Sequence, residues 1–450
     1  MNRALALLGA TMVAAALPSV TPAGATAPLS PSAAIRHVVV MTQGGRSFDN
    51  YFGRRPGVDG IPATSCQLPS SAKQPVCIAP HVLTPASRQL PLLSTAGIEA
   101  ASINHGGMNG FVRAQASDRS DGMAADGYFR PGSLPLLDDI SRRAVLFDHW
   151  FAGVPGGTVA NRFFGITAKP PGDRQQVPPQ GWPVTPTIFD RLSAAGVSWR
   201  VYVQNYEPAL TIDTASTKQL IGGQVPRVPL LAMRRFLDDP ALSSHVMDLD
   251  RYYSDLAANR LPALSWIVST STTEQAPQDP TRGQQLSRAV INALLMSSAW
   301  QHAAFLLSYD DSGGWFDHVR PPTVAGATVG LRVPTMLLSP YAVPGSVNHA
   351  TFDAASTLKL IEQVWRLAPL SVRDLVARSP LSAFDFNRTP QTTSLIAVPG
   401  GGPVPQPRRL VLYLGYLAAF CVVLGLWAVG YRSAQRPLPQ PPRPVEPGAR

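Results

Sequence analysis

The sequence predicts a three-layer α/β/α domain built on a mostly parallel central sheet. Six short segments are almost continuously apolar, and segments with helical spacing lie between them. Continuous apolar runs indicate strands that are covered on both faces, as in a parallel sheet between two layers of helices. The expected strands are Ile35–Met41, Ala144–Phe147, Trp199–Val203, Ala263–Val268, Ala303–Tyr309 and Val333–Ser339.

Three helices are expected among these strands. Thr187–Ala195 follows Pro186, and proline is favoured in the first turn of a helix. Gly283–Gln301 and Ala354–Leu367 repeat apolar residues three or four positions apart, which gives each segment one apolar face. Such helices would cover the two faces of the sheet.

The two ends of the chain are expected to lie outside the folded domain. Residues 1–27 combine a short basic start, an uncharged apolar run and a small-residue cleavage site, which is the pattern of a secretory signal peptide. Leu410–Tyr431 carries no charge and, at about 1.5 Å per residue, is long enough to cross a bilayer of roughly 30 Å as a transmembrane helix.

These features predict a single-pass cell membrane protein with its main domain extracytoplasmic. Residues 34–388 would form that domain, and residues 389–409, rich in Pro and Gly, would tether it to the membrane. Residues 432–450 are Pro-rich and basic, and they would form a short cytoplasmic tail.

The net charge of the chain restricts the kinds of molecule that the protein is expected to bind. The formal net charge is +10, and the arginines and single glutamate of the two ends account for +6 of it. The remaining charge is too small to indicate nucleic-acid binding.

Cys66 and Cys77 lie in a Pro-rich loop, where two cysteines alone cannot hold zinc. In an exported protein they are expected to form a disulfide.

Polar residues follow the strands at the positions where a ligand would bind. In open α/β sheets, ligands bind at the carboxyl ends of the strands. Adjacent carboxylates there suit a divalent cation, and a hydroxyl beside glycines can approach it and attack phosphorus. The residues in question are Thr158, Asn161 and Arg162 after one strand, Asp310, Asp311, Asp317 and His318 after another, and His105 in a glycine-rich loop.

The chain resembles the bacterial phosphoesterase family of phospholipase C and acid phosphatases, which has the alkaline-phosphatase-like fold. The resemblance runs from about residue 36 to 386. It is carried by the stretches HVVVMTQGGRSFDNYFGRRPGVDG, DHWFAGVPGGTVANRFF, IFDRLSAAGVSWRVY, SYDDSGGWFDHVRPP, RVPTMLLSPYA and STLKLIE.

The resemblance implies a phosphate-ester hydrolase with one divalent metal and a hydroxyl nucleophile. It places the nucleophile at Thr158, the paired metal ligands at Asp310 and Asp311, and an active-site histidine at His105. Asn161, Arg162 and His318 are then expected to bind substrate, which would be a phosphate ester or a phospholipid headgroup.

Three positions depart from the pattern of the family. Gly44 and Gly45 stand where the family has a Glu and an Asn that bind the metal, and Gln275 stands where it often has a histidine. The metal site is therefore expected to be depleted: it would hold one divalent ion in an active enzyme and none in a pseudoenzyme. The backbone at both glycines is expected to accept side chains, so that Gly44→Glu with Gly45→Asn would be tolerated.

Two functions remain open at this point. One is a working phosphoesterase of the phospholipase C or acid phosphatase type with a rebuilt site. The other is a catalytically impaired pseudoenzyme that keeps the fold to bind a ligand or partner at the cell envelope.

Overall fold

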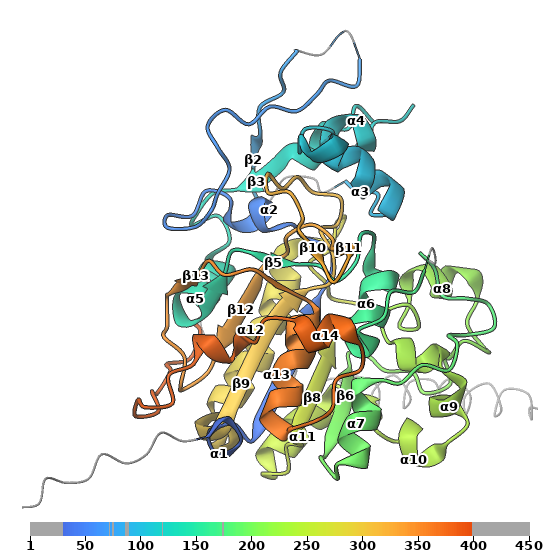
Figure 1. Ribbon diagram of the computed structural model, residues 1–450, viewed down its shortest axis with the longest axis vertical. Helices are drawn as coiled ribbons and strands as arrows, with labels where there is room; N and C mark the ends of the chain where they lie inside the picture. The colour runs from blue at the N-terminus through green and yellow to red at the C-terminus, as the bar shows by residue number, and fades with distance from the viewer. Residues whose placement is uncertain are drawn as a thin grey trace, which may run out of the picture. The chain divides into compact units, whose positions relative to one another are not determined.

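An eight-stranded sheet forms the centre of the molecule (Figure 1). The computed structural model describes residues 30–397, apart from 72, 74–75, 86–89, 119 and 173–174. Across the sheet the strands run in the order β13 (Val347–Asn348), β4 (Val145–Phe147), β12 (Thr335–Leu338), β9 (Ala303–Tyr309), β1 (His37–Gln43), β8 (Leu264–Val268), β6 (Trp199–Val203) and β7 (Val246–Asp248).

The strand order explains why the six predicted strands read as continuous apolar runs. β1 lies between β8 and β9 and is parallel to both, and β6 continues the parallel arrangement to β7. β12 is antiparallel to β9 and β4, so the sheet is mixed at that side. Every residue of β8 and β9 is buried. All six predicted strands are present, with ends shifted by up to two residues.

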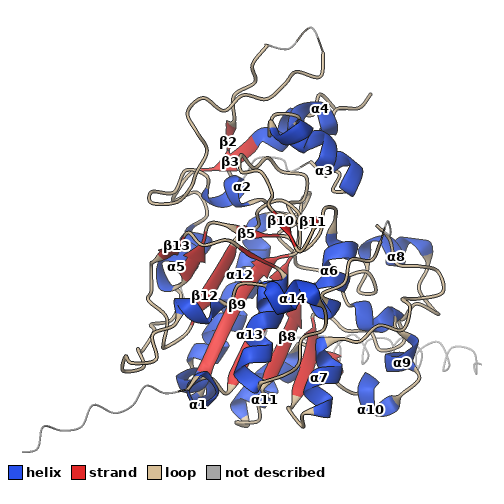
Figure 2. Ribbon diagram, in the orientation of Figure 1, coloured by secondary structure: helices blue, strands red, loops and turns tan. Residues whose placement is uncertain are grey.

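Helices cover both faces of this sheet, which confirms the expected layers. Figure 2 shows α13, α14 and α7 in front of the sheet. Among the helices, α13 packs against α1 and α6, and α6 packs against α7. A second group is formed by α12, which packs against α5 and α11. The helices are α1 (Pro31–Ala34), α5 (Pro135–Arg143), α6 (Thr158–Thr167), α7 (Ile188–Ala194), α11 (Asp250–Ala257), α12 (Pro280–Leu295), α13 (Ala355–Trp365) and α14 (Val372–Val376).

Two groups of smaller elements lie around the sheet. The first follows β1 and lies beyond the carboxyl ends of the central strands (Figure 1). It contains α2 (Phe48–Phe52), β2 (His81–Leu83), α3 (Ala96–Ile103), η1 (Asn104–Gly106), α4 (Phe111–Gln115), η2 (Met123–Asp126) and β3 (Gly127–Phe129). The second contains α8 (Thr217–Gly222), η3 (Pro229–Ala232), α9 (Arg234–Leu237) and α10 (Pro240–Ser243).

The remaining elements are short. β5 (Trp150–Phe151) pairs with β14 (Phe352–Asp353), and β10 (Thr323–Val324) pairs with β11 (Ala327–Thr328). Two 3₁₀ turns, η4 (Ser298–His302) and η5 (Pro380–Ala383), complete the set in the part of the chain that the structure describes.

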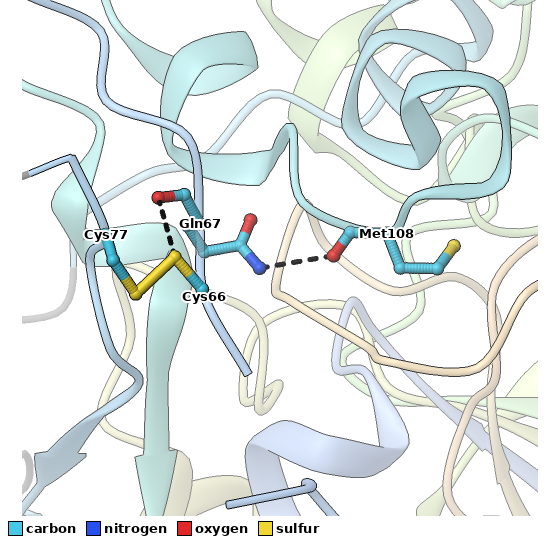
Figure 3. The surroundings of a disulfide bond; sticks show 4 residues. All are labelled: Cys66, Gln67, Cys77 and Met108. Carbon is cyan, nitrogen blue, oxygen red and sulfur yellow. Dashed lines mark hydrogen bonds between the residues drawn. A yellow bond between two sulfur atoms is a disulfide. The ribbon is translucent and has the colours of Figure 1, made fainter. Parts of the chain in front are cut away.

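The predicted disulfide between Cys66 and Cys77 is present (Figure 3). The residue after Cys66 fixes this loop to the neighbouring segment, because the Gln67 side-chain amide donates to the Met108 carbonyl at 3.2 Å. The loop is thus attached to the segment that carries α3 and α4.

The prediction of a transmembrane helix is contradicted. Among the described residues no helix combines the length and the apolar character that crossing a bilayer requires. A single-pass membrane localisation consequently has no support. The segment on which the prediction was based, 410–431, lies outside the described residues, as do the expected signal peptide, 1–27, and the tail, 432–450.

Candidate active site

The strands β1 and β9 bring the glycine pair and the aspartate pair together. They are parallel neighbours, and their last residues, Gln43 and Tyr309, are paired in register. Gly44-Gly45 and Asp310-Asp311 therefore leave the same edge of the sheet side by side. The amide of Gly45 donates to Asp310 Oδ1 at 3.1 Å, which ties the two turns together.

Asp310 is paired with a guanidinium from α6. Arg162 Nε donates to Asp310 Oδ2 at 2.8 Å, and both side chains are almost fully buried. Arg162 Nη2 also donates to the carbonyl of Thr42 at 2.9 Å. The other oxygen of Asp310 accepts the amide of Asp311 at 2.9 Å, in addition to the Gly45 amide. Both oxygens of Asp310 are thus engaged by N–H groups.

Asp311 accepts the hydroxyl of Thr158, the first residue of α6. Thr158 Oγ1 donates to Asp311 Oδ2 at 3.0 Å, and Ser94 Oγ donates to Oδ1 at 3.2 Å. The amide of Gly313 donates to the same Oδ1. Burial, with a further contribution from the charge of Asp310, raises the pKa of the Asp311 carboxyl to about 7. A carboxylate that holds a hydroxyl proton in this way is a candidate general base.

The loop before Thr158 is fixed by Glu99 and Asn161. The buried Glu99 accepts the amides of Gly156 and Leu331, each at 2.9 Å. Asn161 accepts the amide of Val154 and donates to the carbonyls of Val154 and Gly156, all at 3.1 Å. The amide of Asn161, which was expected to bind substrate, therefore bonds to the backbone of the loop.

Gln275 and Arg227 lie beside the glycine pair. A Cβ placed on Gly44 would lie 3.2 Å from Gln275 Oε1 and 3.7 Å from Arg227 Nη1. Arg227 Nη2 donates to Gln275 Oε1 at 3.3 Å. Two of the positions that depart from the family pattern, Gly44 and Gln275, are thus neighbours in the fold.

The expectation that both glycines accept side chains is wrong for Gly45. Its φ is +33°, in the left-handed region, and a Cβ there would lie 3.0 Å from the Cα of Gly313. Backbone cannot move aside as a side chain can, so Gly45→Asn would be strained. Gly44 has no positive φ, and its contacts are with the side chains of Gln275 and Arg227.

His318 lies in a separate network around Arg332. His318 Nδ1 contacts Asp49 Oδ2 at 2.7 Å, while Arg332 binds Asp49 at 3.0 Å and Asp317 at 2.8 Å. Asp49, Asp317 and His318 offer ligand atoms close enough together to hold a metal ion, and they form the only such group found among the described residues. Their carboxylates already bind the buried guanidinium of Arg332.

His105 is exposed, and its backbone is left-handed, with φ of +55°. Within the described part of the chain, neither His105 nor His318 hydrogen-bonds to Thr158, Asp310 or Asp311. The structure thus brings together Thr158, Arg162, Asp310 and Asp311, but it does not join the two histidines to them. Arg227, which no motif indicated, lies at the glycine pair because a distant segment folds back there.

The donor set at Asp310 and Asp311 does not fit the divalent ion that the resemblance implies. The oxygens of both carboxylates accept hydrogen bonds from N–H or O–H groups, and a guanidinium is paired with Asp310. Gly44 and Gly45 offer no side-chain ligand, and a divalent ion depends on several oxygen or nitrogen donors.

The protein is thus a three-layer α/β protein with a hydroxyl, two carboxylates and a guanidinium at the carboxyl edge of its sheet. A comparison with family models then assigns the family. The model of the phosphoesterase family matches residues 35–368, about three quarters of the sequence, and the chain belongs to that family.

Curated relatives of the chain are named as phospholipases C. Phospholipase C A of Mycobacterium tuberculosis is 27% identical over 424 residues, which cover 80% of this chain and 79% of the relative. Non-specific phospholipase C6 of Arabidopsis thaliana is 25% identical over 421 residues, which cover 82% and 76%. Among solved structures, a protein in the alkaline phosphatase superfamily from Vibrio parahaemolyticus is 12% identical with a TM-score of 0.34, over 71% of this chain and 75% of that one.

Proposed function

We propose that the protein is a phosphoric ester hydrolase in which Thr158 is the nucleophile and Asp311 is the base that takes its proton. The observation that carries the proposal is the hydrogen bond from Thr158 Oγ1 to Asp311 Oδ2 at 3.0 Å. A hydroxyl needs such a partner because it is a weak nucleophile at its ordinary pKa. The position of Thr158 at the start of α6 adds the partial positive charge of a helix N-terminus, which favours a bound phosphate.

The reaction would proceed in two displacements. Thr158 Oγ attacks phosphorus, a P–Oγ bond forms, and the P–O bond to the leaving alcohol breaks. The Thr158 proton passes to Asp311 and from there to the leaving oxygen. Water then attacks the phosphothreonine while Asp311 takes a proton of the water. The P–Oγ bond breaks, the proton passes from Asp311 to Thr158 Oγ, and the phosphate product is released.

The names of the relatives support phospholipids as the substrate class. They are called phospholipases C. We therefore propose a phosphodiester in a phospholipid headgroup as substrate, with simple phosphate monoesters as the alternative. The chain's own residues leave both classes open.

The test compares the wild type with two variants of the nucleophile. The full-length protein would be assayed on p-nitrophenyl phosphate and on phosphatidylcholine in mixed micelles. We expect Thr158→Ala to lose turnover by at least about 10³-fold, because a nucleophile has no substitute in this mechanism. Thr158→Ser keeps the hydroxyl and should retain activity. Turnover that survives Thr158→Ala would refute the proposal.

The second candidate function is a ligand-binding protein without turnover. It is favoured by the glycine pair, because Gly44 and Gly45 give no side chain to the site and Gln275 packs against both. Absence of product from both substrates, together with retained binding of phosphate, would support this function over the hydrolase.

A further inference from the structure

We propose that Arg227 and Arg162 form a metal-independent binding site for a phosphoryl group at the edge of the glycine pair. The proposal deepens the proposed hydrolase function and rests on it for the class of substrate. The turns after β1 and β9 offer too few ligand atoms for a divalent ion. The guanidinium groups of Arg162 and Arg227 approach the same two turns.

Arg227 reaches the glycine pair from the second group of smaller elements. It follows the turn that begins at Gln224, which is buried and anchored by donating to the carbonyls of Glu207 and Leu210 at 2.8 and 2.7 Å. Arg227 Nη1 lies 3.7 Å from the position that a Cβ on Gly44 would take, which is an ordinary van der Waals distance. A side chain longer than that of alanine at this position would meet the guanidinium.

Both guanidiniums retain hydrogen-bonding capacity inside the protein. Nε and Nη1 of Arg227 and Nη1 of Arg162 are buried and have no hydrogen-bond partner in the part of the chain that the structure describes. Buried polar groups are normally paired, and an unpaired one costs about 1–3 kcal/mol, more when it is charged. The two side chains reach the turns that follow β1 and β9, Arg227 at Gly44 and Arg162 at Asp310, so these nitrogens are available to a ligand that accepts hydrogen bonds there.

The unpaired donors belong to guanidinium groups, which favour an anionic acceptor. Burial lowers the pKa of Arg227, the carboxylates of Asp310 and Asp311 raise it, and the charge of Arg162 lowers it. The two arginines are therefore close enough to repel each other, and Asp310 attracts both of them. A phosphoryl group would relieve this repulsion, and guanidinium groups bind its oxygens through paired N–H donors.

The experiment measures binding of inorganic phosphate to the full-length protein by titration calorimetry in the presence of a chelator. We expect the wild type to bind phosphate without added metal. Arg227→Gln should weaken binding by about 10- to 100-fold, the loss that corresponds to one charge-assisted hydrogen-bonded contact. Arg227→Lys keeps the positive charge but not the two parallel N–H donors of the guanidinium, and it should show a smaller loss of phosphate affinity.

Two further variants separate this effect from misfolding. Arg234→Gln removes an exposed guanidinium seven residues further along the chain, which pairs with Asp213, and it should leave the phosphate affinity unchanged. Gly44→Glu keeps Arg227 but adds a carboxylate beside its Nη1, so phosphate binding should weaken as in Arg227→Gln. If Arg227→Gln does not fold, Gly44→Glu tests the same contact.

The outcomes distinguish this inference from the proposed function. Phosphate binding that appears only after a divalent metal is added, or that is unchanged in Arg227→Gln and Gly44→Glu, would overturn the inference, even if the esters are hydrolysed. Metal-free binding that depends on Arg227, without hydrolysis of either ester, would support the inference and refute the hydrolase.

Discussion

At the scale of single residues, the two glycines after β1 differ in what they tolerate. Gly44 faces the flexible side chains of Gln275 and Arg227, whereas Gly45 has a positive φ and lies against the backbone of Gly313. The identity of these residues could be read from the sequence, and so could their place at the end of a strand. Their backbone angles could not, because φ depends on how the turn packs against Gly313, which is distant in the chain.

We predict that Gly45→Ala destabilises the protein by about 1–3 kcal/mol, since it forces a Cβ into a left-handed conformation against backbone atoms. Gly44→Ala should change the free energy of unfolding by less than about 1 kcal/mol, because Gln275 can shift and the unfolded chain loses entropy. Urea unfolding of the two variants and the wild type checks both. Equal losses for the two variants would show that φ at Gly45 is not the restricting factor.

The candidate site was only partly predictable from single residues. Thr158, Asp310 and Asp311 follow strands whose apolar pattern is strong, so their meeting at one edge follows from a parallel sheet. Arg227 belongs to no strand and no motif, and its place depends on the tertiary fold of the segment after β6. His318 was expected to bind substrate, and its contact with Asp49 could not be foreseen from spacing, because it depends on the buried guanidinium of Arg332, which binds Asp49 and Asp317.

At the scale of elements, local signals decided how well each boundary was predicted. β6 and β9 have the expected bounds because apolar runs begin and end sharply there. α12 begins at Pro280, three residues before the expected start, because Asp279 caps it by accepting the amide of Thr281 at 2.9 Å. The expected end was too late, since Ser298–His302 forms a separate 3₁₀ turn.

The cap of α7 provides a prediction at this scale. Thr187 and Asp190 form a capping box, in which the Thr187 amide donates to Asp190 Oδ2 at 2.7 Å. Thr187→Ala removes the cap hydroxyl and should lower the free energy of unfolding by about 1 kcal/mol. Thr187→Ser keeps the cap and serves as the control. Because α7 lies outside the site, phosphate binding should be unaffected by either change, and a loss of binding would show that α7 and the site are coupled.

At the scale of the whole molecule, the protein buries several carboxyl groups, and burial is the main cause of a raised pKa at each of them. Burial raises the pKa of Asp126 and of Glu99 to about 8, and that of Glu274 to about 7. These groups hold their protons in the folded state and lose them near pH 4 in the unfolded state. The folded state therefore binds more protons than the unfolded state between about pH 4 and pH 8. It follows that these groups lower the free energy of unfolding as the pH rises through this window.

Asp126 allows this dependence to be tested at one position. Neither of its carboxyl oxygens has a hydrogen-bond partner among the described residues, and burial is the main cause of its raised pKa, followed by the charge of Asp49. We predict that the wild type is less stable at pH 8 than at pH 5 in urea unfolding. The loss should be smaller in Asp126→Asn by at least about 1.4 kcal/mol, the equivalent of one pKa unit, because the amide does not titrate. Asp118→Asn, at an exposed position in the preceding loop, should leave the slope unchanged. If Asp126→Asn follows the wild-type slope, then Asp126 is already ionised in the folded protein at neutral pH, and its charge must be compensated.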